Sequence, residues 1–266
     1  MNTLNVHIDG IGFWAPGLPD WAAFARALDG GEPAISSDAA RPVPTVLPPA
    51  ERRRAPEPVL VASEAAGQAC AMAGRDASEL ASVFTSTHGD LVITDAMCAT
   101  LAADPRELSP TRFHNSVHNA PAGYWTVAVH CHATATAISA ERGSFAAGLL
   151  EAAIEVVAEG EPVLLAAYDI AARGPLAEVA PSGIPFAVAF VLSPARGALS
   201  LASLALATLP ERGGDKTFSV PAIEPLLTNP MAAQALPLLV VLARRQPAVL
   251  RLIAGEHTAL RVEVSP

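Results

Sequence analysis

The sequence predicts an α/β fold in which a mixed or parallel sheet lies between helices, and three observations support this prediction. Up to about residue 184, short apolar stretches alternate with longer stretches of helical spacing, which is the pattern of strand and helix units around a sheet. Two strand-like stretches then follow each other directly, at 184–194 and 197–209. Hydrophobic residues make up 51% of the 266 residues and charged residues 16%, so the chain can bury a large core.

The first quarter of the chain predicts one strand and two helices with a proline-rich connection between the helices. Residues 4–14 alternate enough to form the first strand, and 21–30 has the spacing of a short helix. The stretch 41–58 holds six prolines and is expected to be an extended surface connection, because proline cannot lie inside a helix or a central strand. A helix is predicted to follow it at 59–74.

The middle of the chain continues the alternation. In order, we expect a strand at 80–87, a helix at 91–104, a loop at 105–117, a helix at 118–130, a strand at 134–139, a helix ending near Glu159 and a strand at 161–169. Asn119 is the expected N-cap of the helix at 118–130, with Pro121 in the first turn, where a missing N–H does no harm.

The last quarter predicts a hairpin, a helix and two short strands. The stretches 184–194 and 197–209 are joined by a short link of serine, proline and glycine, which suits an antiparallel hairpin. A long loop, a helix at about 230–245 and two short strands complete the chain.

Charge and composition exclude several classes of protein. The formal net charge of −9 and the isoelectric point near 5.2 argue against nucleic acid or an anionic membrane as the main partner, and the one dense basic run is 52–54. The sequence has no apolar run of membrane-spanning length and no signal peptide at its start, so we expect a cytoplasmic protein without a membrane span. The cysteines, Cys70, Cys98 and Cys131, are odd in number and form no CxxC pair, which favours reduced thiols that mostly fill the core.

The stretch 134–153 predicts a buried strand that runs through a tight turn into a helix. Such a junction can hold a nucleophile, because the helix N-terminus stabilises a thiolate or an oxyanion. Ser139 in the turn could act only with a base beside it, and no G-x-S-x-G motif surrounds it. Glu141 and Arg142 are expected to form an exposed or interface pair, and Gly143 and Gly148 to allow close approach between packed helices.

Two further groups of residues could carry chemistry. Cys131 and His132 are adjacent, but neighbouring side chains in an extended segment point to opposite faces, so loop packing is the favoured interpretation. His114 and His118, with His88 or His132, could supply imidazoles to a metal if their segment were helical. No carboxylate or cysteine falls at a ligand spacing nearby, so we expect no metal site and interpret these histidines as hydrogen-bonding groups at a loop boundary or an interface.

The segments VFTSTHGD, LSPTRFHNSVHNAPAGYW, TATAISAERGSFAAGLLEAA and PVLLAAYD, in this order, resemble the N-terminal half of the β-ketoacyl synthases, which have the thiolase fold. The resemblance covers about residues 1–193. It implies a single thiolase-like domain over 1–266, in which 194–266 is a reduced remnant of the second half. Matching the glycines of the family's active-site turn to Gly143 and Gly148 places Ala140 at the position of the catalytic cysteine, so the nucleophile is missing.

The two catalytic histidine motifs of that family are also missing, because the one histidine after position 132 is His257, in AGEHTALRVEV. The chain is therefore similar to the β-ketoacyl synthase-like N-terminal proteins and to the chain length factors of type II polyketide systems, including those of aryl polyene and xanthomonadin-type pigments. This resemblance implies a non-catalytic subunit, without cofactor or metal, that dimerises with an active ketosynthase, or with itself, and helps to shape the acyl tunnel. By analogy, 134–139 and 112–125 lie at the interface and expose aromatic side chains there; the residues expected at the interface or tunnel are Phe113, His114, His118, Asn119, Tyr124, Trp125, Ser139 and Ala140.

The acyl carrier protein is expected to bind mainly the active partner, because carrier proteins are acidic like this chain; the run 52–54 is the local exception. Two alternatives remain open. The chain could be an active acyltransferase or ketosynthase that uses Cys131 or Ser139. It could also be a binding module for small molecules or metals, with His88, His114 or His118 as ligands.

Overall fold

The computed structural model describes residues 3–30, 35, 41–210 and 220–266. The strands are β1 (Leu4–Trp14), β2 (Ala81–Thr85), β3 (Ala135–Ile138), β4 (Val163–Asp169), β5 (Phe186–Ser193), β6 (Ala202–Leu209), β7 (Ala248–Gly255) and β8 (Thr258–Ser265). The helices are α1 (Trp21–Leu28), α2 (Pro49–Arg54), α3 (Glu57–Ala73), α4 (Leu91–Ala103), α5 (Pro110–Asn115), α6 (Ala120–Ala128), α7 (Ser144–Glu159), α8 (Leu176–Val179) and α9 (Pro230–Arg244). Short 3-10 helices are η1 (Ala77–Glu79), η2 (Pro105–Glu107), η3 (Glu141–Gly143) and η4 (Pro221–Thr228).

The strands form one eight-stranded mixed sheet in the order β3-β2-β4-β5-β1-β6-β8-β7. The first three, β3, β2 and β4, run parallel to one another, and every later pair in this order is antiparallel. The predicted mixed sheet between helices is therefore confirmed.

The predicted hairpin of β5 and β6 is wrong, because β1 lies between these strands and pairs antiparallel with both. The physical reason lies in the sequence of β1. From Ile8 to Trp14 every residue of this strand is buried, so β1 needs cover over both of its faces, which a position inside the sheet provides. There β1 pairs with β5 from His7 to Trp14 and with β6 from Leu4 to Ile8, and the link after Ser193 crosses over it to Ala202.

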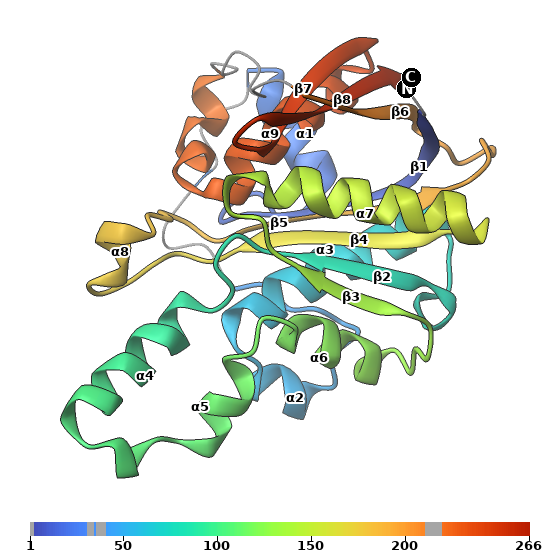
Figure 1. Cartoon of the computed structure of the whole chain (residues 1–266). Coiled ribbons are helices and arrows are strands. Elements are labelled where there is room, and N and C mark those ends of the chain that lie inside the picture. The colour runs from blue at the N-terminus through green and yellow to red at the C-terminus, as the bar shows by residue number, and fades with distance from the viewer. Residues whose placement is uncertain (1–2, 31–34, 36–40, 211–219) are drawn as a thin grey trace.

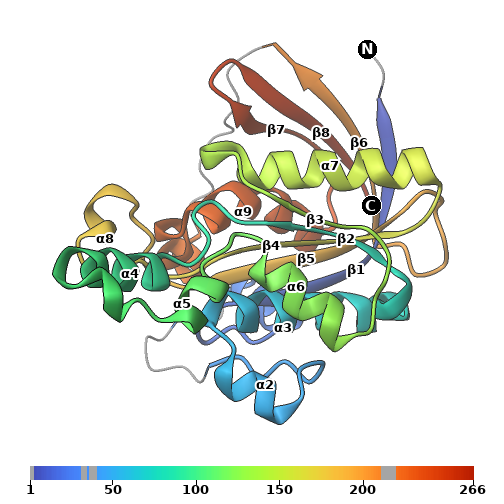
Figure 2. The same ribbon diagram turned by 60° about the horizontal axis from the view of Figure 1, so that its bottom comes forward.

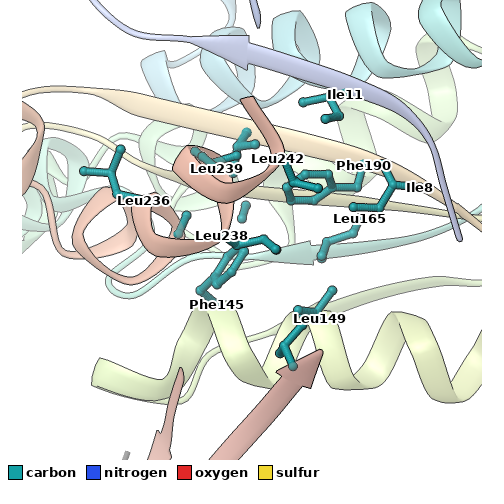
Figure 3. Close-up of a cluster of buried hydrophobic side chains, with 14 of the residues drawn as sticks. Ile8, Ile11, Phe145, Leu149, Leu165, Phe190, Leu236, Leu238, Leu239 and Leu242 are labelled. Atoms are coloured by element: carbon teal, nitrogen blue, oxygen red, sulfur yellow. The ribbon is translucent and has the colours of Figure 1, made fainter. Parts of the chain in front are cut away.

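Helices cover both faces of the sheet (Figures 1 and 2). α3 and α6 pack on one face, and α7, α9 and α1 pack on the other. Successive residues of the buried strands point to opposite faces of the sheet, as side chains along a strand do. In β4, Leu164 packs in the core on the α3 side and Leu165 in the core on the α7 side. Figure 3 shows the second core, where Phe145 and Leu149 of α7 meet Leu238 of α9 over the sheet.

Gly143 and Gly148 allow close approach between layers of the fold, but the elements that they contact differ from those expected. A Cβ at Gly143 would lie 2.7 Å from the carbonyl oxygen of Ala254 on β7, and a Cβ at Gly148 would lie 2.6 Å from Cγ2 of Thr85 on β2. Both glycines therefore allow close approach, as predicted. Their partners are strands, however, and not helices.

Short helices are present in two segments where the sequence predicted none. The proline-rich stretch 41–58 forms α2 and also supplies the first turn of α3, because its prolines lie at the first helical positions, where they are tolerated. The stretch 105–117 contains η2 and α5, which are capped by the side chains of Asp104 and Ser109. Proline-rich composition excludes helix interiors but not helix starts.

The remaining predicted elements are present with shifts of a few residues at their ends. The last helix is α9, and the two final strands, β7 and β8, form an antiparallel hairpin. The loop expected before α9 lies outside the described residues at 211–219, and η4 follows it. In the described part of the chain, no helix combines the length and the apolar character that crossing a membrane requires.

Candidate functional site

The predicted strand-to-helix junction is present between β3 and α7, with η3 as its turn. The turn is held by internal hydrogen bonds: the Ser144 hydroxyl accepts from the N–H of Ala140 at 2.9 Å and donates to the carbonyl oxygen of Glu141 at 2.8 Å. The N–H of Gly143 donates to the carbonyl of Ala140 at 2.8 Å. Glu141 has a φ of +49°, a left-handed conformation that a residue other than glycine adopts at a cost. The junction is therefore a constrained turn with Ala140 at its start.

The side chains at the start of this turn offer no activated nucleophile. Ala140 and Ser139 are both exposed. Ala140 ends in a methyl group, and the Ser139 hydroxyl donates to the carbonyl oxygen of Thr87 at 3.1 Å. Within the described residues, no hydrogen bond joins this hydroxyl to a histidine or a carboxylate. Ser139 thus lacks the neighbouring base that a serine nucleophile needs.

A buried polar cluster lies beside the junction, at the carboxyl ends of β2 and β4. One oxygen of Asp169 accepts hydrogen bonds from the Ser86 hydroxyl at 2.6 Å and from the N–H of Thr87 at 2.9 Å. The other oxygen, Oδ2, and the Thr87 hydroxyl have no partner in the described part of the chain. Burial raises the pKa of Asp169, and the hydrogen bonds from Ser86 and Thr87 oppose this shift. The sequence reasoning missed Asp169, although an acid at the end of an otherwise apolar strand was the available signal.

An open, mostly apolar groove lies between α2, α5 and α6. Its volume is about 600 Å³. The lining residues are Leu47, Pro48, Glu51, His114, Val117, Asn119, Ala120, Gly123, Tyr124, Val127, Ala128 and His130. Val127 is 75% exposed, and Phe113 on α5 is 59% exposed. Apolar side chains at this exposure mark a surface suited to an apolar partner or ligand.

The segment 112–125 divides its predicted residues between the groove and the core. His114, Asn119 and Tyr124 line the groove, and the Tyr124 hydroxyl donates to the side-chain oxygen of Asn115 at 3.2 Å. Asn119 is the N-cap residue of α6, as predicted, but its side chain makes no capping hydrogen bond. The ring Nε2 of His118 lies 3.2 Å from the carbonyl oxygen of Ser86, which connects this segment to the end of β2.

The expected exposure of Trp125 is wrong. This side chain is fully buried, with its ring 6.4 Å from the ring of Phe84. Tyr124 and Trp125 are consecutive residues on a helix and therefore point in directions about 100° apart. When Tyr124 lines the groove, Trp125 points into the core under β2.

The cysteines do not reach the junction. Cys131 is buried, and its thiol donates to the carbonyl oxygen of Leu80 at 3.3 Å. Cys70 is buried in α3, and this burial raises its pKa to about 12. Cys98 on α4 is exposed, so the expected core role holds for two of the three cysteines.

The candidate metal-binding histidines do not form a cluster in the part of the chain that the structure describes. Among the residues that the structure describes, no three His, Cys, Asp or Glu side chains gather closely enough to hold a metal ion. His88 follows β2, His114 lies at the groove and His132 is exposed.

β3 is an end strand of the sheet, and among the residues that the structure describes no strand pairs with its outer edge. The carbonyl oxygens of Thr134 and Ile138 accept from the N–H groups of Ser82 and Ser86. Because backbone groups alternate in direction along a strand, Ala135 and Ala137 turn their N–H and C=O groups away from β2. An open strand edge is a template for pairing with another chain.

The sheet, its two helical layers and the strand–turn–helix junction define a thiolase-like ketosynthase fold. The model of the β-ketoacyl synthase N-terminal domain matches residues 21–237, and the chain belongs to this family. A search of curated proteins finds none that matches the chain.

Solved structures share the fold. One chain of a ketosynthase (ApeO) in complex with its chain length factor (ApeC) from Xenorhabdus doucetiae is 24% identical, with a TM-score of 0.72 over 98% of this chain and 99% of that chain. A chain of an ishigamide ketosynthase/chain length factor is 14% identical, with a TM-score of 0.72 over 98% and 99%. In contrast, ketosynthase twelve of the bacillaene polyketide synthase from Bacillus amyloliquefaciens is matched over 73% of its own length, at 12% identity and a TM-score of 0.68.

Proposed function

We propose that this protein is a non-catalytic ketosynthase-like subunit that dimerises with an active β-ketoacyl-ACP synthase and helps to shape its acyl tunnel, in the manner of a chain length factor. The observation that carries the proposal is the junction of β3 and α7, which keeps the strand, the constrained turn and the helix but has Ala140 at the start of the turn. The proposed setting is cytoplasmic synthesis of an aryl polyene, another polyketide or a fatty acid-type chain.

The chemistry of the junction supports the non-catalytic part. A methyl group cannot form the thioester through which a condensing enzyme holds its acyl chain. The Ser139 hydroxyl donates a hydrogen bond to a backbone carbonyl oxygen. Cys131 is buried against Leu80, before the start of β3, whereas the turn follows the end of this strand. Neither alternative nucleophile is placed to replace the missing thiol.

The open edge of β3 and the groove support the dimer. The edge offers backbone groups for a continuous sheet across two chains, and Phe113 and Val127 add exposed apolar surface on α5 and α6. A stable interface buries about 1,600 Å² in total. The ketosynthase named with its chain length factor among the solved structures suggests a heterodimer as the principal assembly, and pairing with a second copy of this chain is the alternative.

The groove supports the tunnel role. Tyr124, Val117 and Val127 give it an apolar wall, while His114 and Asn119 place polar groups at its margin. Such a wall suits an extended acyl chain, whose methylene groups gain about 0.8 kcal/mol each on leaving water. The proposal needs no cofactor and no metal ion.

The charge of the chain supports carrier-protein binding mainly by the partner. At a net charge of −9, we expect this subunit to repel an acidic carrier protein. The exception is the end of α2, where Arg52, Arg53 and Arg54 follow one another.

The test is the mass of the intact protein after incubation with an activated acyl thioester, for the wild type and for Cys131→Ala and Ser139→Ala. We expect no added acyl mass in any of them. We also expect a cognate ketosynthase to co-purify with the wild type. An acyl adduct that disappears in Cys131→Ala or in Ser139→Ala would instead identify an active acyltransferase.

A further inference from the structure

The last helix of the chain reaches the first turn of α7. The side-chain oxygen of Gln234 on α9 accepts a hydrogen bond from the backbone N–H of Phe145 at 3.0 Å. The amide nitrogen of Gln234 donates to the carbonyl oxygen of Pro230, one turn earlier in α9, also at 3.0 Å. Both ends of the amide are therefore engaged. Phe145 and Leu238 pack together beside this contact (Figure 3), which fixes α9 against α7.

The Phe145 N–H belongs to the group of helix N–H donors that have no partner inside their own helix. Such donors, together with the positive end of the helix dipole, are what stabilises an anion at a helix N-terminus. Here Gln234 occupies the donor of Phe145. The N–H groups of Ala140, Gly143 and Ser144 are also occupied, by the Ser144 hydroxyl, the Ala140 carbonyl and the Glu141 carbonyl respectively.

The same part of the chain holds the turn in place from a second side. Gly143 packs directly on the backbone of Ala254 in β7, where a Cβ would lie 2.7 Å from the carbonyl oxygen. Both α9 and β7 belong to the stretch 194–266, which follows β5. This stretch therefore contacts the junction at its turn and at the first turn of its helix.

We propose that Gln234 is a built-in cap of the α7 N-terminus, which keeps the junction unable to stabilise a thiolate or an oxyanion even when a nucleophile is supplied at position 140. Gln234 acts as a positioning residue through the Phe145 N–H. The inference goes beyond the proposed function, because it depends on the hydrogen bonds of this chain alone and holds with or without a ketosynthase partner.

The experiment restores a thiol and measures its pKa with and without the cap. Ala140→Cys and the double variant Ala140→Cys/Gln234→Ala are made in a Cys98→Ser background, since Cys98 is the exposed native thiol. The rate of alkylation at position 140 by iodoacetamide is followed from pH 5 to pH 10 by peptide mass spectrometry. We expect an ordinary thiol pKa of about 8.5 with the cap and a pKa at least about one unit lower without it, which means about ten times more thiolate at pH 6.

Three control variants distinguish loss of the Gln234 hydrogen bond from a general destabilisation of the junction. Gln246→Ala removes a glutamine just after α9 and should leave the pKa of the introduced thiol unchanged. Gln234→Glu keeps an acceptor for the Phe145 N–H and adds a negative charge, so the thiol pKa should not fall. Gln234→Leu keeps most of the side-chain volume without an acceptor and replaces the alanine variant if that variant does not fold.

Two results would overturn the proposal. One is a pKa of the introduced thiol that is already depressed with Gln234 in place, and the other is a thiol pKa that does not change in Gln234→Ala, or in Gln234→Leu where the alanine variant does not fold. Neither result touches the proposed function, which fails on a different observation: acylation of the wild type at Cys131 or Ser139.

Discussion

At the scale of single residues, Asp169 is a carboxylic acid whose buried environment disfavours its charged form. One oxygen of this buried carboxylate accepts hydrogen bonds from Ser86, from Thr87 and, at 3.5 Å, from the N–H of His88, while the other oxygen has no partner among the described residues. The burial is therefore not fully compensated. Its raised pKa follows from this imbalance. The free energy of folding should therefore depend on its protonation.

We expect Asp169→Asn to flatten the dependence of stability on pH. In the wild type the folded state holds the Asp169 proton more tightly than the unfolded state, so the free energy of unfolding falls as pH rises from about 4 through the raised pKa. Asparagine keeps an acceptor for Ser86 and Thr87, carries no charge and removes this contribution. Urea unfolding between pH 4 and pH 8 measures the slope of each protein.

Glu57 and Asp90 have pKa values raised by burial as well, so the slope of the variant should be smaller than that of the wild type without vanishing. Identical slopes for the two proteins would show that Asp169 titrates alike in the folded and unfolded states.

A second residue-scale prediction compares two helical glycines. Gly148→Ala should lower the free energy of unfolding by about 1–3 kcal/mol, because the new Cβ would lie within 3 Å of two carbon atoms of Thr85. Gly123→Ala in α6 is the matched control: no atom lies within 4 Å of its Cβ position, and better helix propensity should raise stability by about 0.5–1 kcal/mol. Urea unfolding at pH 7 should give opposite signs, and equal changes would contradict the packing account.

At the scale of elements, the local sequence pattern predicted the helices and strands that form mainly through local interactions. The long helices α3, α7 and α9 and the buried strands β4 and β5 follow from apolar spacing and length, and the same patterns are enough to locate the strand–turn–helix junction around Ser139 and Ala140. The position of β1 between β5 and β6 could not be predicted in this way. Pairing of distant strands depends on which faces are covered in three dimensions, and a short link favours a hairpin on local grounds alone.

The open edge of β3 gives the element-scale prediction. Ala137→Pro removes an N–H that points away from β2, so the bonds between β2 and β3 persist and the strand tolerates the change, as proline does at sheet edges. We expect the complex with a ketosynthase, or with a second copy, to weaken at least about tenfold, which is about 1.4 kcal/mol. Analytical ultracentrifugation measures this, and Ala137→Ser, which keeps the N–H, is the control.

Thermal unfolding of Ala137→Pro must remain close to that of the wild type for the comparison to hold. An undiminished complex with a normally folded proline variant would mean that the two chains do not pair through this edge.

At the scale of the whole molecule, the two ends of the sheet differ in what lies beside them. The last residues, α9, β7 and β8, extend the sheet and cap the start of α7, whereas β3, α5 and α6 leave an edge and an apolar groove open. The sequence located the segments that form this second region, 112–125 and 134–139, through their family resemblance. It could not separate Tyr124 at the groove from Trp125 in the core, because that depends on the rotation of α6 against β2.

We therefore expect a charged side chain to weaken the complex when it is placed in the groove, but not when it is placed on β7 at the other end of the sheet. Val127→Lys places an ammonium group in the groove, and Val249→Lys places one on β7 at the opposite edge of the sheet, where the valine is 54% exposed. Burying an unpaired charge in an interface is costly, so Val127→Lys should weaken the complex with a ketosynthase, or with a second copy, at least about tenfold. Val249→Lys should bind like the wild type, and titration calorimetry at matched salt measures both. Equal affinities for the two variants would place the interface away from the groove, and weaker binding by Val249→Lys alone would move it to the β7 edge.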